Sequence, residues 1–205
     1  TVASPDAMRT VASDLLAHQL RATCVMWIDM HDDGTKTATP HYGTGEGPPP
    51  CRPEQLRLIE FDDELEACLR SERTRVVGDV LETLGCRRHL AAWQAMGTRA
   101  YVAVPLVRQG RLIAALGVHH SLPREWTSDE VTLIKATAER TWTAVERLQV
   151  EEVLRTNEEQ LRRAIQNAPT PIILFTTDGQ VLQLSNTWTS RTGYTATELT
   201  TFDAW

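Results

Sequence analysis

The stretch "RAYVAVPLVRQGRLIAALGVHH", Arg99–His120, contains two runs of apolar residues on either side of Gln109-Gly110. Runs that are rich in β-branched and aromatic residues and flank a short turn containing Gly predict a β-hairpin.

The second run of the hairpin has an alternating pattern, and neighbouring residues of a strand point to opposite faces of a sheet. Gly117 and His119 therefore share one face, and Leu116 and Val118 share the other. The same rule separates His119 from His120, so that only one of the two imidazoles can line a given cavity.

Further helices and strands are indicated before the hairpin. Ser4 is placed to cap a first helix, and Pro5 suits the first helical position. Alternating apolar residues then predict another hairpin, with its turn at the sequence DDG. The expected elements are a helix over 4–20, a hairpin over 22–47, a strand over 56–61, a helix over 62–73, a strand over 74–80 and a helix over 87–97. This order predicts an α+β fold, with an antiparallel sheet flanked by helices.

A long helix is expected after the hairpin. Thr127 and Glu130 have the spacing of a capping box, and no Gly or Pro occurs between Ser128 and Ala168. The first half of this helix has one apolar phase, suited to packing on the domain. The second half has another phase, with the spacings of four and three that are typical of a coiled coil. The residues of this second phase are Val150, Leu154, Asn157, Leu161 and Ala164.

These spacings favour a dimeric helical linker over residues 149–166, in which Asn157 would help to set the register of the two helices. The alternative is a single surface helix. After the linker, residues 171–186 predict two short strands around Asp178-Gly179. About forty residues are too few for a stable domain, so residues 167–205 are expected to be part of a larger domain.

Composition narrows the possible partners. The net charge of -6 argues against nucleic acid as the main partner, and no apolar run approaches the length of a membrane span. The spacing of the six histidines predicts no metal site. The four cysteines lie far apart without a CxxC motif, which indicates a reducing compartment such as the cytoplasm. No catalytic residues are expected, although Cys51 and Cys86 are candidates to face one cavity.

Three segments together resemble a GAF domain, the small-molecule sensing module of bacterial signalling proteins. They are "RVVGDV" (75–80), "MGTRAYVAVPLVRQGRLIAALGVHH" (96–120) and "REWTSDEVTLIKATAERTWTAVE" (124–146). The likeness implies a GAF sensor domain over 1–148. It also implies that the long helix carries a signal to an output domain of the same chain.

The segment "EEQLRRAIQNAPTPIILFTTDGQVLQLSNTWTSRTGYTATEL" (158–199) resembles the start of a PAS domain. A GAF domain followed by a helical linker and a PAS domain is similar to the input half of bacterial sensor histidine kinases. This resemblance implies a two-component phosphorelay. The motifs of the kinase itself are not among these 205 residues.

The GAF segment is also similar to the bilin-binding GAF domains of phytochromes and cyanobacteriochromes. His89 and His119 match the two histidines that flank the bilin in that family, but Arg88 stands where the chromophore-bearing Cys would be. Covalent attachment there is therefore not expected. The alternative that the resemblance implies is a noncovalent bilin, with Arg88 suited to pair with a propionate.

The sequence is consistent with three hypotheses for the cavity of this domain. It binds an unidentified small ligand, it binds a noncovalent bilin, or it is filled by side chains in a domain that only dimerises. Gly117 is expected to leave room for a ligand beside His119. The candidate ligand-binding residues are His89, His119, Arg88, Trp93, Met96 and Gly117.

Overall fold

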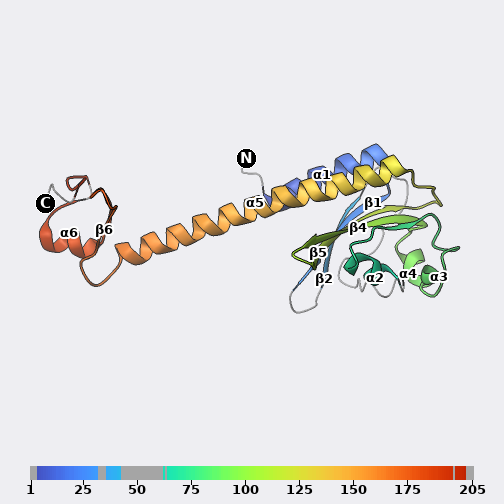
Figure 1. The fold of residues 1–205 in the computed structure, drawn as a ribbon, viewed down its shortest axis with the longest axis horizontal. Helices are drawn as coiled ribbons and strands as arrows, with labels where there is room; N and C mark the ends of the chain where they lie inside the picture. The colour runs from blue at the N-terminus through green and yellow to red at the C-terminus, as the bar shows by residue number, and fades with distance from the viewer. Residues whose placement is uncertain (1–3, 32–35, 43–61, 63, 196, 202–205) are drawn as a thin grey trace. The chain divides into compact units, whose positions relative to one another are not determined.

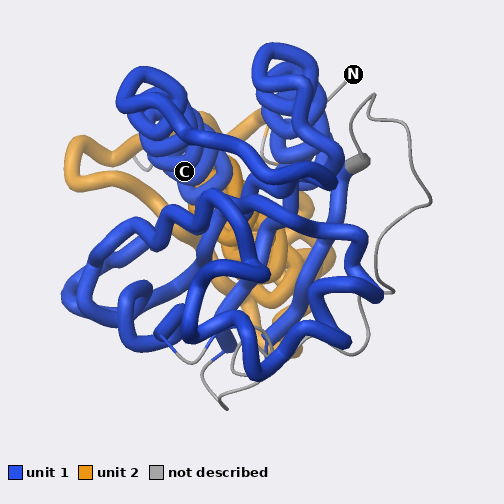
Figure 2. Tube along the Cα trace, turned by 90° about the vertical axis from the view of Figure 1, so that its right-hand side faces the viewer, with its two compact units in different colours: residues 1–147 blue, residues 148–205 orange. Residues whose placement is uncertain are grey.

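The computed structural model describes residues 4–31, 36–42, 62, 64–195 and 197–201. The chain divides into two compact units, Thr1–Arg147 and Leu148–Trp205, which are coloured separately in Figure 2. The predicted strand over 56–61 and the DDG turn over 32–34 lie outside the described residues.

Among its described residues, unit 1 forms a five-stranded antiparallel sheet in the order β2-β1-β5-β4-β3. The predicted hairpin is confirmed, and its strands are two of the three inner strands. Gln109 and Gly110 both have positive φ, 52° and 73°, as a tight turn between twisted strands requires. The strands are β1 Cys24–Met30, β2 Lys36–Tyr42, β3 Arg75–Val77, β4 Ala100–Arg108 and β5 Arg111–His120.

Helices cover both faces of this sheet (Figure 1). One face packs against α1 (Pro5–Leu20) and the first part of α5 (Ser128–Gln166). The other face lies over α2 (Leu65–Arg70), α3 (Leu84–Arg87) and α4 (Leu90–Ala95). The α+β architecture predicted from the sequence is therefore confirmed.

The predicted division of the strand residues between the two faces is also confirmed. Leu116 and Val118 belong to the cluster under α1 and α5, together with Trp27. Gly117 and His119 point the other way, since His119 stacks on Tyr101 of the opposite cluster. His119 is buried whereas His120 is only partly buried.

The start of the first helix agrees with the sequence pattern. The Ser4 hydroxyl accepts a hydrogen bond from the Ala7 amide at 3.1 Å, and Pro5 occupies the first turn. The long helix also begins as predicted. The Thr127 amide donates to Glu130 Oε2 at 2.9 Å, and the Glu130 amide donates to Thr127 Oγ1 at 3.2 Å, which completes the capping box.

The single helix predicted over 87–97 is wrong, because the chain forms two short helices with Arg88 and His89 between them. His89 has φ -120° and ψ 24°, outside the helical region. The helical hydrogen-bonding pattern is interrupted at this point, because the His89 amide donates to the Cys86 carbonyl, three positions back, at 2.9 Å. Cys86 before the break and Trp93 after it are both buried.

Unit 2 contains the last part of α5 and the strands β6 (Ile173–Phe175) and β7 (Val181–Leu184), followed by α6 (Asn186–Thr192). The two predicted short strands pair antiparallel, and Gly179 in their turn has φ 83°. The boundaries at 148/149 and 166/167 stay predictions.

The apolar residues of the predicted linker are solvent-exposed in this single chain. The exposed fractions are 68% for Val150, 57% for Leu154 and 60% for Leu161. No helix among the described residues is both long enough and apolar enough to cross a membrane.

Candidate functional site

Three aromatic rings stack in a row on the face of the sheet that α4 covers. The Trp93 and Tyr101 rings have centroids 4.7 Å apart and planes inclined by 19°. Tyr101 and His119 lie opposite each other on β4 and β5, with ring centroids 6.0 Å apart and an inclination of 20°. The row thus connects α4 to two inner strands of the sheet.

His119, at one end of this row, is buried and uncharged at neutral pH. Burial disfavours the imidazolium and lowers the pKa of His119 to about 4. Its Nδ1 has no hydrogen-bond partner among the described residues. A buried polar nitrogen without a partner costs free energy, which makes Nδ1 a candidate contact for a ligand or water.

Gly117 lies directly beside this imidazole. A Cβ atom at Gly117 would be 2.7 Å from His119 Nε2. The expectation that Gly117 leaves room for a ligand is therefore not met here, because the His119 ring itself takes up that space. A ligand at this position would require the imidazole to rotate.

A buried carboxylate lies next to the aromatic row. Asp62 is fully buried, and its Oδ2 accepts hydrogen bonds from Arg75 Nε at 2.8 Å and from the Tyr101 hydroxyl at 2.5 Å. The Glu64 amide donates to Oδ1 at 2.9 Å. Burial acts to raise the pKa of Asp62, but these hydrogen bonds outweigh it and hold the pKa below its ordinary value.

No local pattern in the sequence indicates this network, because Asp62 and Tyr101 are 39 positions apart. Gly85 is the nearest indication of it. A Cβ at Gly85 would lie 2.4 Å from Asp62 Oδ1, so only glycine leaves space for the carboxylate.

Cys86 is buried near this carboxylate and stays a thiol. Burial and the neighbouring negative charge of Asp62 raise the pKa of Cys86 to about 12. A reactive cysteine needs the opposite shift, toward the thiolate. Cys51, the other cysteine considered for catalysis, lies outside the described residues. Within the described part of the chain, no group of His, Cys, Asp or Glu is arranged to hold a metal ion.

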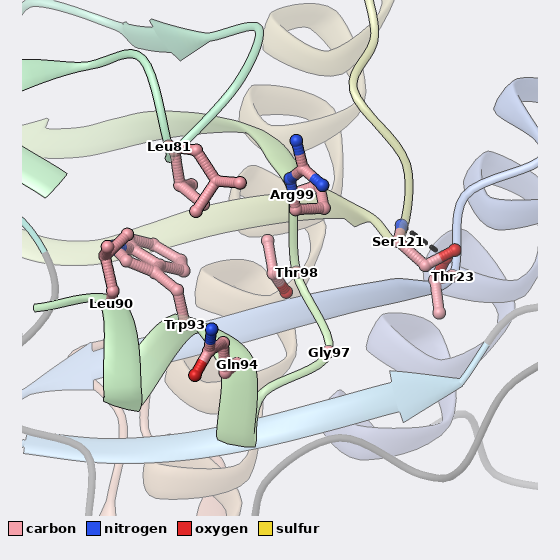
Figure 3. Close-up of a pocket in the computed structure, with 10 residues that line it drawn as sticks. Thr23, Leu81, Leu90, Trp93, Gln94, Gly97, Thr98, Arg99 and Ser121 are labelled. Carbon is pink, nitrogen blue, oxygen red and sulfur yellow. Dashed lines mark hydrogen bonds between the residues drawn. The ribbon is translucent and has the colours of Figure 1, made fainter. Parts of the chain in front are cut away.

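A pocket of about 300 Å³ opens beside Trp93, between α4 and the end of the sheet (Figure 3). One part of its wall is apolar and the other carries hydroxyl and amide groups. The Ser121 amide donates to Thr23 Oγ1 at 3.0 Å, which joins the two strand ends at the rim. The lining residues are Thr23, Val80, Leu81, Leu90, Trp93, Gln94, Gly97, Thr98, Arg99 and Ser121.

Arg99, the one charged residue among the described residues of this lining, is already paired. Arg99 donates from Nε to Asp79 Oδ1 at 3.0 Å and from a terminal nitrogen to Asp79 Oδ2 at 2.6 Å. The hydrogen bond from Arg99 lowers the pKa of Asp79, so the carboxylate stays ionised and balances the guanidinium. The pocket therefore favours a neutral ligand over an anionic one.

A sequence profile of the GAF domain matches residues 5–145. The chain belongs to the GAF domain family. A search of curated proteins found no match.

Solved structures share this GAF fold at low sequence identity. The PixJ GAF domain of Thermosynechococcus elongatus in its blue-light absorbing form aligns with a TM-score of 0.61 and 20% identity, over 76% of this chain and 93% of that one. GAF3 from Slr1393 of Synechocystis sp. PCC6803, in its photoproduct state, gives 0.60 and 21%, over 74% and 99%. The phycocyanobilin-bound GAF domain of a cyanobacterial phytochrome gives 0.59 and 19%, over 72% and 86%.

The residues predicted to bind a ligand occupy different places in this GAF domain. Trp93 lines the pocket and stacks toward His119 through Tyr101. Met96 is buried in the same cluster as Trp93. Arg88 is exposed and His89 is partly buried, both at the break between α3 and α4.

Asp62 should make the stability of the GAF domain depend on pH. Its folded-state pKa is below the ordinary 3.8, so the ionised form stabilises the fold above that pH, and this contribution is lost as the pH falls through the lower folded value. We expect Asp62→Asn to reduce the free energy of unfolding by about 3 kcal/mol at pH 7, because it breaks a buried ion pair. The difference from wild type should shrink below about pH 4.

Urea unfolding at several pH values measures this difference. Asp79→Asn is the matched control, since Asp79 pairs with a partly exposed arginine and should contribute less than about 1 kcal/mol. An Asp62→Asn difference that stays constant from pH 7 to pH 3 would contradict the assignment.

Proposed function

We propose that unit 1 is a ligand-sensing GAF domain of a bacterial signalling protein, and that it binds a small neutral molecule beside Trp93. The proposal rests on the position of Trp93 at the wall of the pocket. Its ring lines the pocket and also stacks on Tyr101, which stacks on His119. A ligand against Trp93 would therefore act directly on a row of rings anchored in β4 and β5.

The dimensions and charge of the pocket support this class of ligand. A volume of about 300 Å³ is at the low end for small-molecule sites. The apolar residues Leu81 and Leu90 suit a flat apolar group, and the hydroxyl of Thr98 suits a hydrogen-bonding group. Because Asp79 balances Arg99, a charged group on the ligand would gain little.

Benzamide is a suitable probe because it combines a flat ring with a neutral amide. We expect saturable shifts of the backbone amide resonances of Thr98 and Ser121 on titration with benzamide, followed by NMR. Trp93→Leu should weaken binding by about tenfold, because it removes the aromatic face.

Trp126→Leu is the matched control for Trp93→Leu. The Trp126 ring contacts Arg124 and the Val77 carbonyl and does not belong to the pocket lining, so this variant should bind benzamide like wild type. Saturable shifts confined to other parts of the domain would overturn the proposed site.

A bilin chromophore is the second candidate ligand. His89 and His119 stand at positions that match the bilin-flanking histidines of phytochrome-type GAF domains, and structures of such domains share the fold. In this candidate the bilin is noncovalent, since Arg88 stands at the position of the attachment cysteine. A bilin that entered between the stacked rings would require those of Trp93 and His119 to move apart from Tyr101.

Co-expression with enzymes that make biliverdin or phycocyanobilin tests this candidate through the visible absorption spectrum. A noncovalent bilin should colour the native protein and be lost on denaturation. Arg88→Cys should then retain the pigment on a denaturing gel, whereas Arg87→Cys, one residue away, should not. Colourless protein from the wild type and from both variants would reject the bilin-binding hypothesis.

The signal in this proposal leaves the domain through α5 of a homodimer. Val150, Leu154 and Leu161 share one phase of the helix and are exposed, as residues of a coiled-coil seam are in an isolated chain. Asn157 lies in the same phase. Residues 167–205 are the first part of a PAS domain in this proposal, and the parent protein is a histidine kinase of a two-component system. A cytoplasmic location fits the described cysteines, which form no disulfide.

Replacement of Leu154 and Leu161 by Glu tests the linker. Two negative charges in the seam of each helix should shift the protein from dimer to monomer, as measured by light scattering over a range of concentrations. Gln149→Glu with Thr156→Glu adds the same charge outside the seam phase and should leave the dimer intact. A dimer that survives the change at Leu154 and Leu161 rejects the seam.

A further inference from the structure

Arg9 of α1 lies between two tryptophans from different elements. Its guanidinium carbon is 5.6 Å from the ring centroid of Trp27 on β1 and 5.0 Å from that of Trp142 on α5. The same guanidinium donates to both carboxylate oxygens of Asp29 on β1, at 2.7 and 2.9 Å. One side chain of α1 therefore contacts both the sheet and the long helix.

Burial makes these contacts strong. Arg9 is 9% exposed, Trp27 is completely buried and Trp142 is 8% exposed. Cation–π and charge-assisted contacts gain strength where water is excluded. The planar guanidinium can hold a carboxylate with two donors while its faces lie against aromatic rings, which a lysine ammonium cannot do.

The two tryptophans differ in what else holds them. Trp27 Nε1 donates to Ser13 Oγ at 2.9 Å, which ties this ring to α1. Trp142 Nε1 is buried without a hydrogen-bond partner among the described residues. The ring on the long helix therefore depends on packing and on the Arg9 cation.

Trp27 also connects this cluster to the candidate site. In the sheet register Trp27 lies opposite Leu116 of β5, the strand that carries Gly117 and His119. The strand that carries His119 is therefore paired directly with the strand that carries Trp27 and Asp29.

We propose that Arg9 is a positioning residue that couples strand β1 to the long helix α5, with Asp29 as its anchor on the sheet and Trp142 as its contact on the helix. The purpose of this coupling, the transmission of a signal to α5, rests on the proposed sensory function. The coupling itself is a property of the ligand-free protein. Contact in space does not establish energetic coupling, so the test must measure non-additivity.

A second link between the sheet and α5 provides a matched control. Arg108 at the end of β4 contacts Glu139 and Glu146 of α5 at 3.0 and 3.3 Å. These groups are partly exposed, and exposed ion pairs contribute little. Arg108→Gln should therefore change the behaviour of α5 far less than a change at Arg9.

The experiment is a double-mutant cycle with and without Arg9. Asp29→Asn and Trp142→Phe are made singly and together, first in the wild-type chain and then in Arg9→Met. Amide hydrogen exchange of residues 138–145 in the ligand-free protein reports the opening of α5. With Arg9 present, we expect the two changes to be non-additive by at least about fivefold in the opening constant.

In Arg9→Met the same two changes should be additive within about twofold, because the connection between them is gone. Arg9→Lys, which keeps the charge but loses the paired donors, should give an intermediate value, and it replaces Arg9→Met if that variant does not fold. The Arg108→Gln background should preserve the full non-additivity.

Two results would overturn the inference: additive effects in the wild-type chain, or non-additivity that persists without Arg9. Neither depends on the pocket, because no ligand is present. Failure of benzamide to bind would reject the proposed ligand site. It would not affect the test of coupling by Arg9, which depends only on the double-mutant cycle.

Discussion

The antiparallel pairing of β1, β5 and β4 is the constraint on which the rest of the GAF domain depends. Both faces of these strands are covered by helices, so alternate side chains enter two separate cores. Leu116 and Val118 bury apolar surface against α1 and α5. His119 and Tyr101, on the opposite face, form the aromatic row. A shift of one residue in this pairing would exchange the two sets and destroy both.

The two faces of the sheet perform different tasks. The face toward α4 holds polar groups in an apolar surrounding: a neutral imidazole, a paired carboxylate and a protonated thiol. The face toward α5 is largely apolar, and Arg9 lies against Trp27 and Trp142 of its core. The candidate site and α5, the proposed output helix, thus lie on opposite faces of one sheet. In this proposal the signal passes through the sheet.

Much of the fold could be predicted because its signals are local. The turn at Gln109-Gly110, the cap at Ser4 and the capping box at Thr127 each depend on residues within a few positions of one another. The break at His89 could not be predicted, because the sequence from Arg87 to Gly97 contains no Gly or Pro before its last residue that would signal the end of a helix. Of the candidate site, His119 was predicted from a family likeness, and Trp93 was predicted as a tryptophan on the helix expected over 87–97. Asp62 and Arg9 were not, since their partners are distant in sequence and become neighbours only in the folded chain.

Gly85 shows how narrowly the buried carboxylate is accommodated. Its backbone is helical, so any amino acid could adopt its conformation, yet even a methyl group would meet Asp62 Oδ1 at 2.4 Å. The restriction at this position is therefore one of volume and not of backbone geometry. During divergence of the sequence, positions 85 and 62 are thus bound to change together: a larger residue at 85 becomes acceptable only after the carboxylate at 62 has been replaced by something smaller, and with it the partner of Arg75 and Tyr101 is lost.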